Sequence, residues 1–167
     1  MMCDEGLIGI SGTNSESIMV HTNSREAILG SNPLAFAMPA EPFAFWFDAA
    51  TTVVPKGRME VYSKKGLALP GGWAVDENGE VCTDAEHVLE CIDGKLGAGG
   101  ILPVGGESEK MGSHKGYGYS MICELLCAIT VAEMKNMCEY LGMDSAEYLG
   151  EVDTSHAKAG TYDKVYK

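Results

Sequence analysis

A glycine-rich segment, residues 112–119, carries the side chains best suited to holding an anion. His114 and Lys115 stand among its glycines, directly before an apolar stretch that predicts a helix. Glycine lets the backbone adopt positive φ and lets a ligand approach closely, and the first N–H groups of a helix are unpaired at the positive end of its dipole. Lys115 would add a full charge there. The alternative is a tight entry turn with a solvated Lys115, because the segment matches none of the standard phosphate motifs.

Histidines and cysteines offer two further kinds of chemistry. His114 is a candidate general base, because an unperturbed imidazole has a pKa of about 6.5. His21 and His87 are lone histidines in polar settings, and neither is expected to be catalytic. Cys82, His87 and Cys91 could converge on a metal ion if the intervening helix folds suitably, but their spacing fits no recognised zinc pattern. The sequence therefore assigns no metal ligand.

Predicted strands must carry the polar loops to such a site. Residues 7–10 form a short apolar run that ends in a polar turn, and a loop after a buried strand is a usual ligand position. The aromatic runs at 34–38 and 43–47 predict two further core strands, whose short connection makes them antiparallel neighbours. Asn32 and Pro33 are expected to fix the backbone between a turn and a strand.

Two helices are predicted on the pattern of apolar residues. Residues 54–65 predict a helix that stops at Gly66. The helix is expected to begin at Val54, so that Pro55 falls in the first turn, where proline is tolerated. Residues 117–140 predict the longest helix, with an apolar stripe along one face.

The middle of the chain predicts smaller elements. Residues 76–79 are a hairpin-type turn between two short runs of strand character. Thr83 stands where a capping residue would open a short helix, and Gly94 would close it. The glycines of residues 97–106 indicate a long, flexible loop that leads into the glycine-rich segment.

Composition bounds the class of protein. The chain has 167 residues and a net charge of −12, with a pI near 4.6, which predicts one domain without a nucleic-acid or membrane partner. The sequence shows no signal peptide and no apolar run that could span a membrane, so a cytoplasmic location is expected. Six cysteines occur. Cys123 and Cys127 lie one turn apart in an apolar helix, which favours reduced, buried thiols over a disulfide framework.

An ordered series of sequence blocks carries a resemblance to a known family. The blocks are residues 30–36, 47–52, 57–60, 72–79, 102–106 and 114–118. Together they resemble the type 2 malate/L-lactate dehydrogenases, which include sulfolactate and ureidoglycolate dehydrogenases. The resemblance spans roughly residues 5–130, and an ordered series of this kind is far more specific than any single block.

The resemblance implies an α/β fold with a largely antiparallel or mixed sheet and flanking helices. This is a nicotinamide-dinucleotide-binding domain of a non-Rossmann type, consistent with the absence of a G-x-G-x-x-G fingerprint. The cofactor, NAD or NADP, is expected to contact Ser15, Asp48, Ala49, Ala50 and Lys115. Ser15 could instead be a turn former, and Asp48 could cap a following helix.

The same resemblance implies hydride transfer to or from a small 2-hydroxy or 2-oxo acid, in a homodimer. The family's catalytic histidine precedes the equivalent of Glu5, so no catalytic residue is assigned here. Residues 5–130 are expected to form an incomplete cofactor-binding domain and residues 131–167 a divergent helical tail. Alternatives are a non-catalytic dinucleotide-binding module or a non-functional remnant. The chain departs from the family in having Ser31 for threonine, and in two acids, Glu107 and Glu109, close to the proposed anion site.

Overall fold

The structure, a computed structural model, describes the backbone of residues 1–140 and the side chains of residues 1–127. The chain divides into two compact units, Met1–Glu124 and Leu125–Lys167. The sites discussed below belong to the first unit. The turn predicted at 144–149 and most of the predicted tail lie outside the described residues. No helix in the described part is long and apolar enough to cross a membrane.

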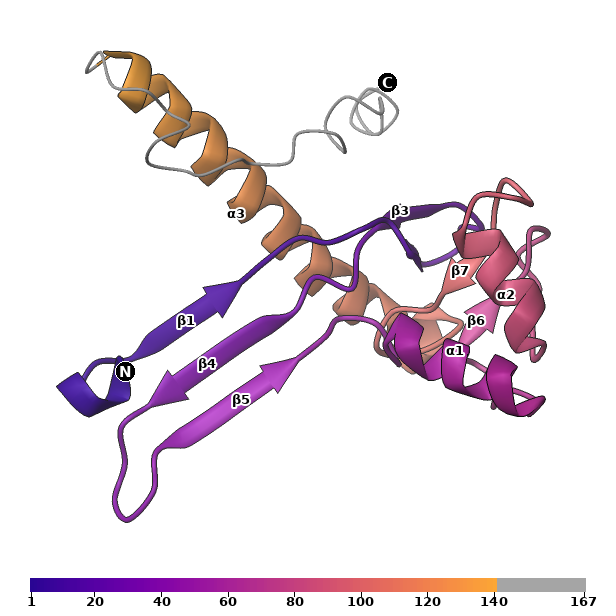
Figure 1. The fold of residues 1–167 in the computed structure, drawn as a ribbon, viewed down its shortest axis with the longest axis horizontal. Helices are drawn as coiled ribbons and strands as arrows, with labels where there is room; N and C mark the ends of the chain where they lie inside the picture. Colours follow the sequence, from indigo (N-terminus) through magenta and orange to yellow (C-terminus); the bar gives the residue numbers. More distant parts are fainter. Residues whose placement is uncertain (141–167) are drawn as a thin grey trace. The chain divides into compact units, whose positions relative to one another are not determined.

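A three-stranded antiparallel sheet follows the short 3-10 helix η1 (Cys3–Glu5) (Figure 1). Its strands are β1 (Gly9–Gly12), β4 (Leu34–Met38) and β5 (Phe45–Ala49), in the order β1-β4-β5. The strand predicted at 34–38 is confirmed, but the prediction that these strands are buried in the core is wrong, because Ile10, Phe36 and Trp46 are exposed. The two neighbours of β4 each begin two residues later than predicted, because the register pairs Met38 with Phe45 and leaves Phe43 in the connecting loop. We call these three strands the outer sheet.

A second, four-stranded sheet has the order β3-β2-β7-β6. It is mixed, since β2 (Met19–Val20) and β7 (Gly100–Ile101) run parallel while the other pairs are antiparallel. Sequence patterns missed β2 and β3 (Ala27–Leu29). The loop predicted at 97–106 is wrong at β7, because Gly100 serves close strand packing: a Cβ there would lie 2.7 Å from the Ile18 carbonyl oxygen. We call these four strands the inner sheet.

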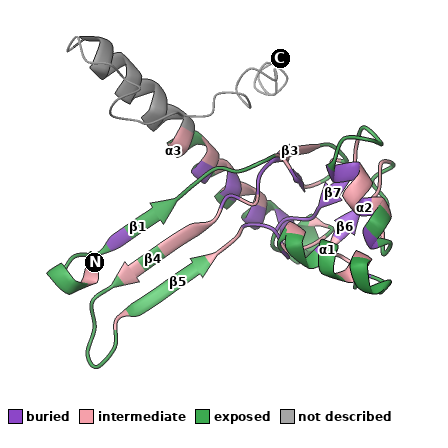
Figure 2. Ribbon diagram, in the orientation of Figure 1, coloured by how far each residue is buried: buried purple, intermediate pink, exposed green. Residues whose placement is uncertain are grey.

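Two helices form a common core with the inner sheet. Figure 2 shows buried residues, in purple, on β6 (Ala74–Val75), β7 and α2 (Ala85–Ile92). The predicted hairpin is confirmed, with Val75 of β6 bridging to Val81. Helix α1 (Lys56–Lys65) ends at Gly66 as predicted, with φ of 60°. It begins after Pro55 rather than at Val54, because a residue before proline is disfavoured in the helical region. The core contains Ile18, Val54, Met59, Leu69, Ala74, Ala85, Val88, Ile92 and Ile101.

The cap of α2 (Ala85–Ile92) corrects a sequence prediction. Its N-cap is Asp84, not Thr83. The Asp84 carboxylate accepts hydrogen bonds from the backbone N–H groups of Glu86 and His87, at 3.0 and 3.2 Å. A charged carboxylate also suits the positive end of the helix dipole better than a hydroxyl does.

The long helix α3 (Ser113–Tyr140) begins at Ser113 and not at Tyr117. The preceding 3-10 helix η2 (Glu109–Met111) ends at Gly112, whose φ of 88° turns the chain into α3. Glycine is required at position 116 inside the helix, because a Cβ there would collide with the Val104 carbonyl oxygen. Lys115 therefore lies in the first turn of a helix, and the prediction that it sits in a loop before the helix is wrong.

Candidate cofactor-binding site

Asn32 holds together the region that contains the predicted cofactor contacts. Its side chain is fully buried. Its Oδ1 accepts from the Ser15 backbone N–H at 3.0 Å, while its Nδ2 donates to the Ser120 carbonyl of α3 at 3.1 Å and to Glu124 Oε2 at 2.9 Å. One amide therefore ties the loop after β1 to α3. Asn32 has a φ of 32°, not the extended backbone expected of a residue before proline, and its contact with α3 has no signal in the sequence.

Ser15 is linked through Ser31, which precedes β4, to the segment that follows β5. The Ser31 backbone N–H donates to Ser15 Oγ at 3.0 Å, and the two hydroxyl oxygens are 3.2 Å apart. The Ser31 carbonyl in turn accepts from the Thr51 backbone N–H at 2.8 Å and from its hydroxyl at 2.9 Å. Because Thr51 directly follows Ala50, the fold brings two of the predicted cofactor segments together. Ser15 itself is exposed to solvent.

Asp48 and Ala49 belong to β5 itself rather than to a loop after it. Asp48 pairs with Ala35 across the outer sheet, and its side chain is exposed. The alternative that Asp48 caps a helix is wrong, because α1 starts only at Lys56 and has Pro55 as its N-cap. The carboxylate is thus available for contact with a ligand near the end of the strand.

Lys115 projects from the first turn of α3, where it is exposed together with His114. Among the described residues it forms no ion pair, so Glu107 and Glu109, which are also exposed, do not neutralise it. Its charge adds to the positive end of the helix dipole.

The first turn of α3 is anchored to the chain just after β2. The buried Ser113 shares a 3.0 Å hydroxyl contact with Thr22. The rings of His21 and Tyr117 lie 5.5 Å apart. The first turn is therefore a fixed feature of the fold and can hold Lys115 in one place.

Backbone contacts through Val104 link Lys115 to the other predicted residues. The Val104 N–H donates to the Thr51 carbonyl at 2.8 Å, and Gly116 packs closely on Val104. Ser15, Ser31, Thr51, Val104 and Gly116 thus form a continuous series of contacts. We call this series the polar junction. It positions Ser15, Ala50 and Lys115 on one framework.

Thr52 has the one buried side-chain oxygen or nitrogen atom without a hydrogen-bond partner among the described residues. Its side chain is 4% exposed, and the residue bridges Pro103 beside the polar junction. An unsatisfied buried hydroxyl costs about 1–3 kcal/mol. Sequence reasoning missed this group.

The sequence model described as malate/L-lactate dehydrogenase matches residues 1–147. The chain belongs to the malate/L-lactate dehydrogenase family. It is 43% identical over 129 residues to the malate dehydrogenase of Pyrococcus horikoshii, which covers 77% of this chain and 34% of that protein. It is 37% identical over 126 residues to a Delta(1)-pyrroline-2-carboxylate/Delta(1)-piperideine-2-carboxylate reductase of Pseudomonas putida, which covers 75% and 33%.

A solved structure agrees with the fold. The crystal structure of malate dehydrogenase from Entamoeba histolytica matches with a TM-score of 0.71 and 34% identity, over 85% of this chain and 40% of that one. The predicted family and the predicted non-Rossmann α/β class are therefore confirmed. The chain spans about a third of the length of the curated relatives it matches.

A second group of chemically active side chains uses none of these residues. Glu77, His87 and Cys91 bring their ligand atoms within 4.8 Å of one another. A hydrogen bond to Glu77 raises the pKa of His87. The pKa of Glu77 is lowered, first by a hydrogen bond from its own backbone N–H and then by His87. Burial, followed by the charge of Glu77, raises the pKa of Cys91 to about 11. Cys82, which the sequence placed with His87 and Cys91, lies outside the group.

Proposed function

We propose that this chain binds NAD or NADP through Ser15, Asp48, Ala49, Ala50 and Lys115, as part of an oxidoreductase that acts on a small 2-hydroxy or 2-oxo acid. The observation that carries the proposal is the exposed Lys115 on the first turn of α3, which has no ion-pair partner among the described residues and which the polar junction holds on the same framework as Ser15 and Ala50.

The donors at this site suit a dinucleotide. Lys115 and the helix dipole would attract the pyrophosphate, which carries negative charge. Ser15 Oγ already accepts a hydrogen bond from Ser31, so its own hydrogen can point to a phosphate or ribose oxygen. The dinucleotide and the acid substrate are both anions, whereas the chain carries a net charge of −12. The site therefore needs positive charge of its own to attract them.

The nicotinamide ring, when bound, supplies or accepts the hydride. The residues of this chain hold and orient the cofactor, which fixes the distance and angle of transfer. We assign no proton-transfer residue. His114 is exposed beside Lys115. It would act as a general base only if its ring came within hydrogen-bond distance of a bound substrate.

The names of the relatives suggest a substrate class wider than malate. Malate and Delta(1)-pyrroline-2-carboxylate both carry a carboxylate on the carbon that gains or loses hydride. We propose a substrate with a C=O or C=N carbon next to a carboxylate, handled by a homodimer in the cytoplasm. The carboxylate supplies a fixed negative group for orientation.

Titration of the purified chain with NADH and NADPH tests the proposal by the change in nicotinamide fluorescence. Saturable binding is expected, weakened about tenfold or more in Lys115→Ala, because an ion pair to phosphate is removed. Lys110→Ala is the matched control, since Lys110 is an exposed lysine of η2 only five positions earlier. Equal binding by the two variants contradicts the assignment of Lys115. Binding without oxidation of malate or lactate would indicate a non-catalytic module.

A further inference from the structure

The group formed by Glu77, His87 and Cys91 stands apart from the proposed cofactor residues in sequence and in hydrogen bonding. His87 Nε2 lies 2.7 Å from Glu77 Oε2, and Cys91 Sγ lies 3.9 Å from the same oxygen. The side chains of Glu77 and His87 are each 36% exposed, whereas Cys91 is 4% exposed. The group therefore opens to solvent on one side and has a buried thiol on the other.

Two local features hold these side chains in place. Glu77 stands in the hairpin turn that Asp76 fixes, since Asp76 Oδ1 accepts from the backbone N–H groups of Asn78 and Glu80 at 2.8 and 3.0 Å. His87 and Cys91 are four residues apart on α2, so they share one face of the helix.

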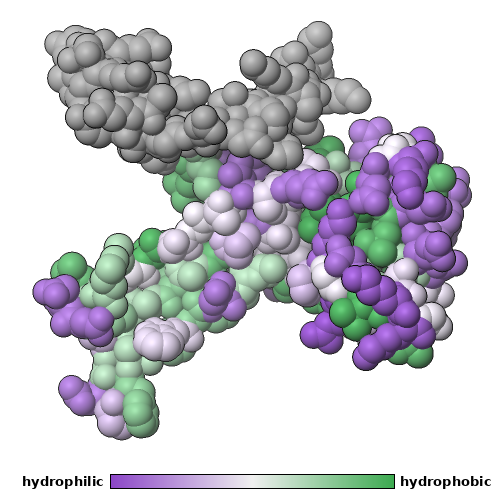
Figure 3. Space-filling model, in the orientation of Figure 1, coloured by the Kyte–Doolittle hydropathy of each residue, from purple (hydrophilic) through white to green (hydrophobic). Residues whose placement is uncertain are grey.

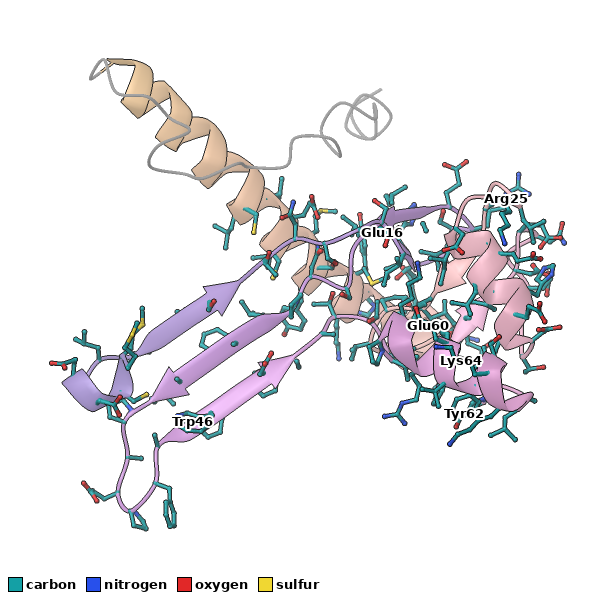
Figure 4. All side chains as sticks on the ribbon, viewed as in Figure 1. Glu16, Arg25, Trp46, Glu60, Tyr62 and Lys64 are labelled. Carbon is teal, nitrogen blue, oxygen red and sulfur yellow. The ribbon has the colours of Figure 1, made fainter. Side chains whose placement is uncertain are left out.

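Neighbouring loops enclose the group. Arg25, labelled in Figure 4, donates to the Glu77 carbonyl at 3.4 Å, which ties the turn to the segment before β3. Gly99 closes the other side, because a Cβ at that position would lie 2.8 Å from Cys91 Sγ. The three ligand atoms are consequently held by a turn, a helix and a loop, and not by a single mobile segment.

We propose that Glu77, His87 and Cys91 form a binding site for one divalent zinc ion, with a fourth position open to water. Carboxylate, imidazole and thiolate are all zinc ligands, at about 2.0–2.3 Å from the metal. In a tetrahedral site such bonds place neighbouring ligand atoms about 3.3–3.7 Å apart. The separations of 2.7 and 3.9 Å from Glu77 Oε2 bracket that range, and all three ligand atoms lie within 4.8 Å of one another, so side-chain adjustments of about 1 Å would bring them to it.

The ligand set selects among metals. A thiolate and an imidazole favour zinc, copper or cobalt over magnesium and calcium, which prefer oxygen. Zn²⁺ would bind Cys91 as the thiolate, which releases the thiol proton, and would bind His87 as a neutral imidazole whose one proton lies on Nδ1. A three-ligand site with an open position differs from the closed, four-ligand sites that serve structure alone.

Zinc and cobalt titrations of the full 167-residue chain, kept reduced, test the site. Wild-type protein is expected to bind one Zn²⁺ in competition with a chromophoric chelator. Co²⁺ is expected to give a thiolate-to-metal charge-transfer band. Substitution of residues that only support metal ligands costs about 10–100-fold in affinity, so Cys91→Ser and His87→Gln should each cost about 100-fold or more.

Two further variants keep the test decisive. Glu77→Gln keeps the size and exposed position of the side chain, so it should fold and still bind Zn²⁺ more weakly. Cys82→Ser is the control, because Cys82 is a nearby thiol outside the group, and it should leave both the affinity and the cobalt band unchanged. Failure of the folded wild type to bind Zn²⁺, equal affinity in Cys91→Ser, or a loss in Cys82→Ser alone would each overturn the proposal. None of these readouts depends on NAD or NADP binding.

Discussion

The outer and inner sheets both contain many apolar side chains but differ in how far these are buried. In the outer sheet Ile10, Phe45, Trp46 and Phe47 are 63, 51, 78 and 48% exposed. In the inner sheet Met19, Val20 and Ile101 are fully buried. Figure 3 shows hydrophobic surface over the outer sheet, and Figure 4 shows Trp46 at the outer strand β5. Backbone pairing alone therefore specifies the outer sheet, whereas the inner sheet also has helices α1 and α2 to form a core.

An exposed apolar sheet has two physical consequences. Its side chains contribute little to stability, because they stay in contact with water. Its uncovered faces and its edge strands β1 and β5 are suited to contact with another protein surface, or to aggregation. The predictions below compare positions inside and outside the covered core.

The largest effect is expected for Met59→Ala. Met59 is fully buried in the core between α1 and the inner sheet, so its truncation should lower the free energy of unfolding by about 2–5 kcal/mol. Trp46→Ala in the outer sheet removes a larger side chain but should cost only about 1 kcal/mol or less, the value of a cross-strand pair. Chemical denaturation measures both. A cost for Trp46→Ala as large as that for Met59→Ala would show that the outer sheet is covered in solution.

A smaller loss in the free energy of unfolding is expected for Asn32→Ala, which tests the link between the loop after β1 and α3. The variant removes partners from the Ser15 N–H and the Ser120 carbonyl, and an unsatisfied buried group costs about 1–3 kcal/mol. Asn14→Ala is the matched control, because Asn14 also donates to Glu124 but is exposed. Thermal or chemical unfolding measures the stability of both variants, and equal stability would contradict the role of Asn32.

The cap of α2 should have a moderate effect. Asp84→Ala is expected to lower the free energy of unfolding by about 1 kcal/mol, because two backbone N–H groups lose their acceptor. Thr83→Ala should have little effect, although the sequence pattern favours Thr83 as the cap. Unfolding curves of the two variants decide between the positions, and a larger cost for Thr83→Ala would reverse the assignment.

The smallest expected effect is the pH dependence of the stability that the pair of His87 and Glu77 contributes to the fold. The raised pKa of His87 contributes stability that is complete below its ordinary value of 6.5 and is lost as the pH rises through the raised pKa. The lowered pKa of Glu77 contributes stability above 4.5 that is lost as the pH falls through the lowered pKa. The pair therefore stabilises the fold most between pH 4.5 and 6.5.

Unfolding of the wild type and of Glu77→Gln, with a chelator present, measures that dependence. The stability difference between the two should shrink above pH 6.5. Glu86→Gln is the control, because Glu86 is an exposed acid in the first turn of the same helix. A difference that stays constant with pH would contradict the shifted pKa values.

Much of the local structure could be predicted because its signals lie close together in the sequence. The strand at 34–38, the stop of α1 at Gly66 and the turn at 76–79 each depend on a few neighbouring residues. The strands β2, β3 and β7 could not be predicted, because two or three residues show no periodicity. Their pairing is a product of contacts between distant segments.

By itself the sequence determined the family, the fold class and the residues proposed to bind the cofactor, because an ordered series of motifs carries that information. Only the tertiary structure decided which residues share a site. It placed Lys115 inside α3, joined Asn32 to a helix some 90 positions later, and set Glu77 beside His87 and Cys91 in place of Cys82. Among the described residues, it also decided that helices cover the inner sheet whereas the apolar side chains of the outer sheet are exposed. Burial and side-chain convergence depend on how distant segments pack, and no local pattern encodes that packing.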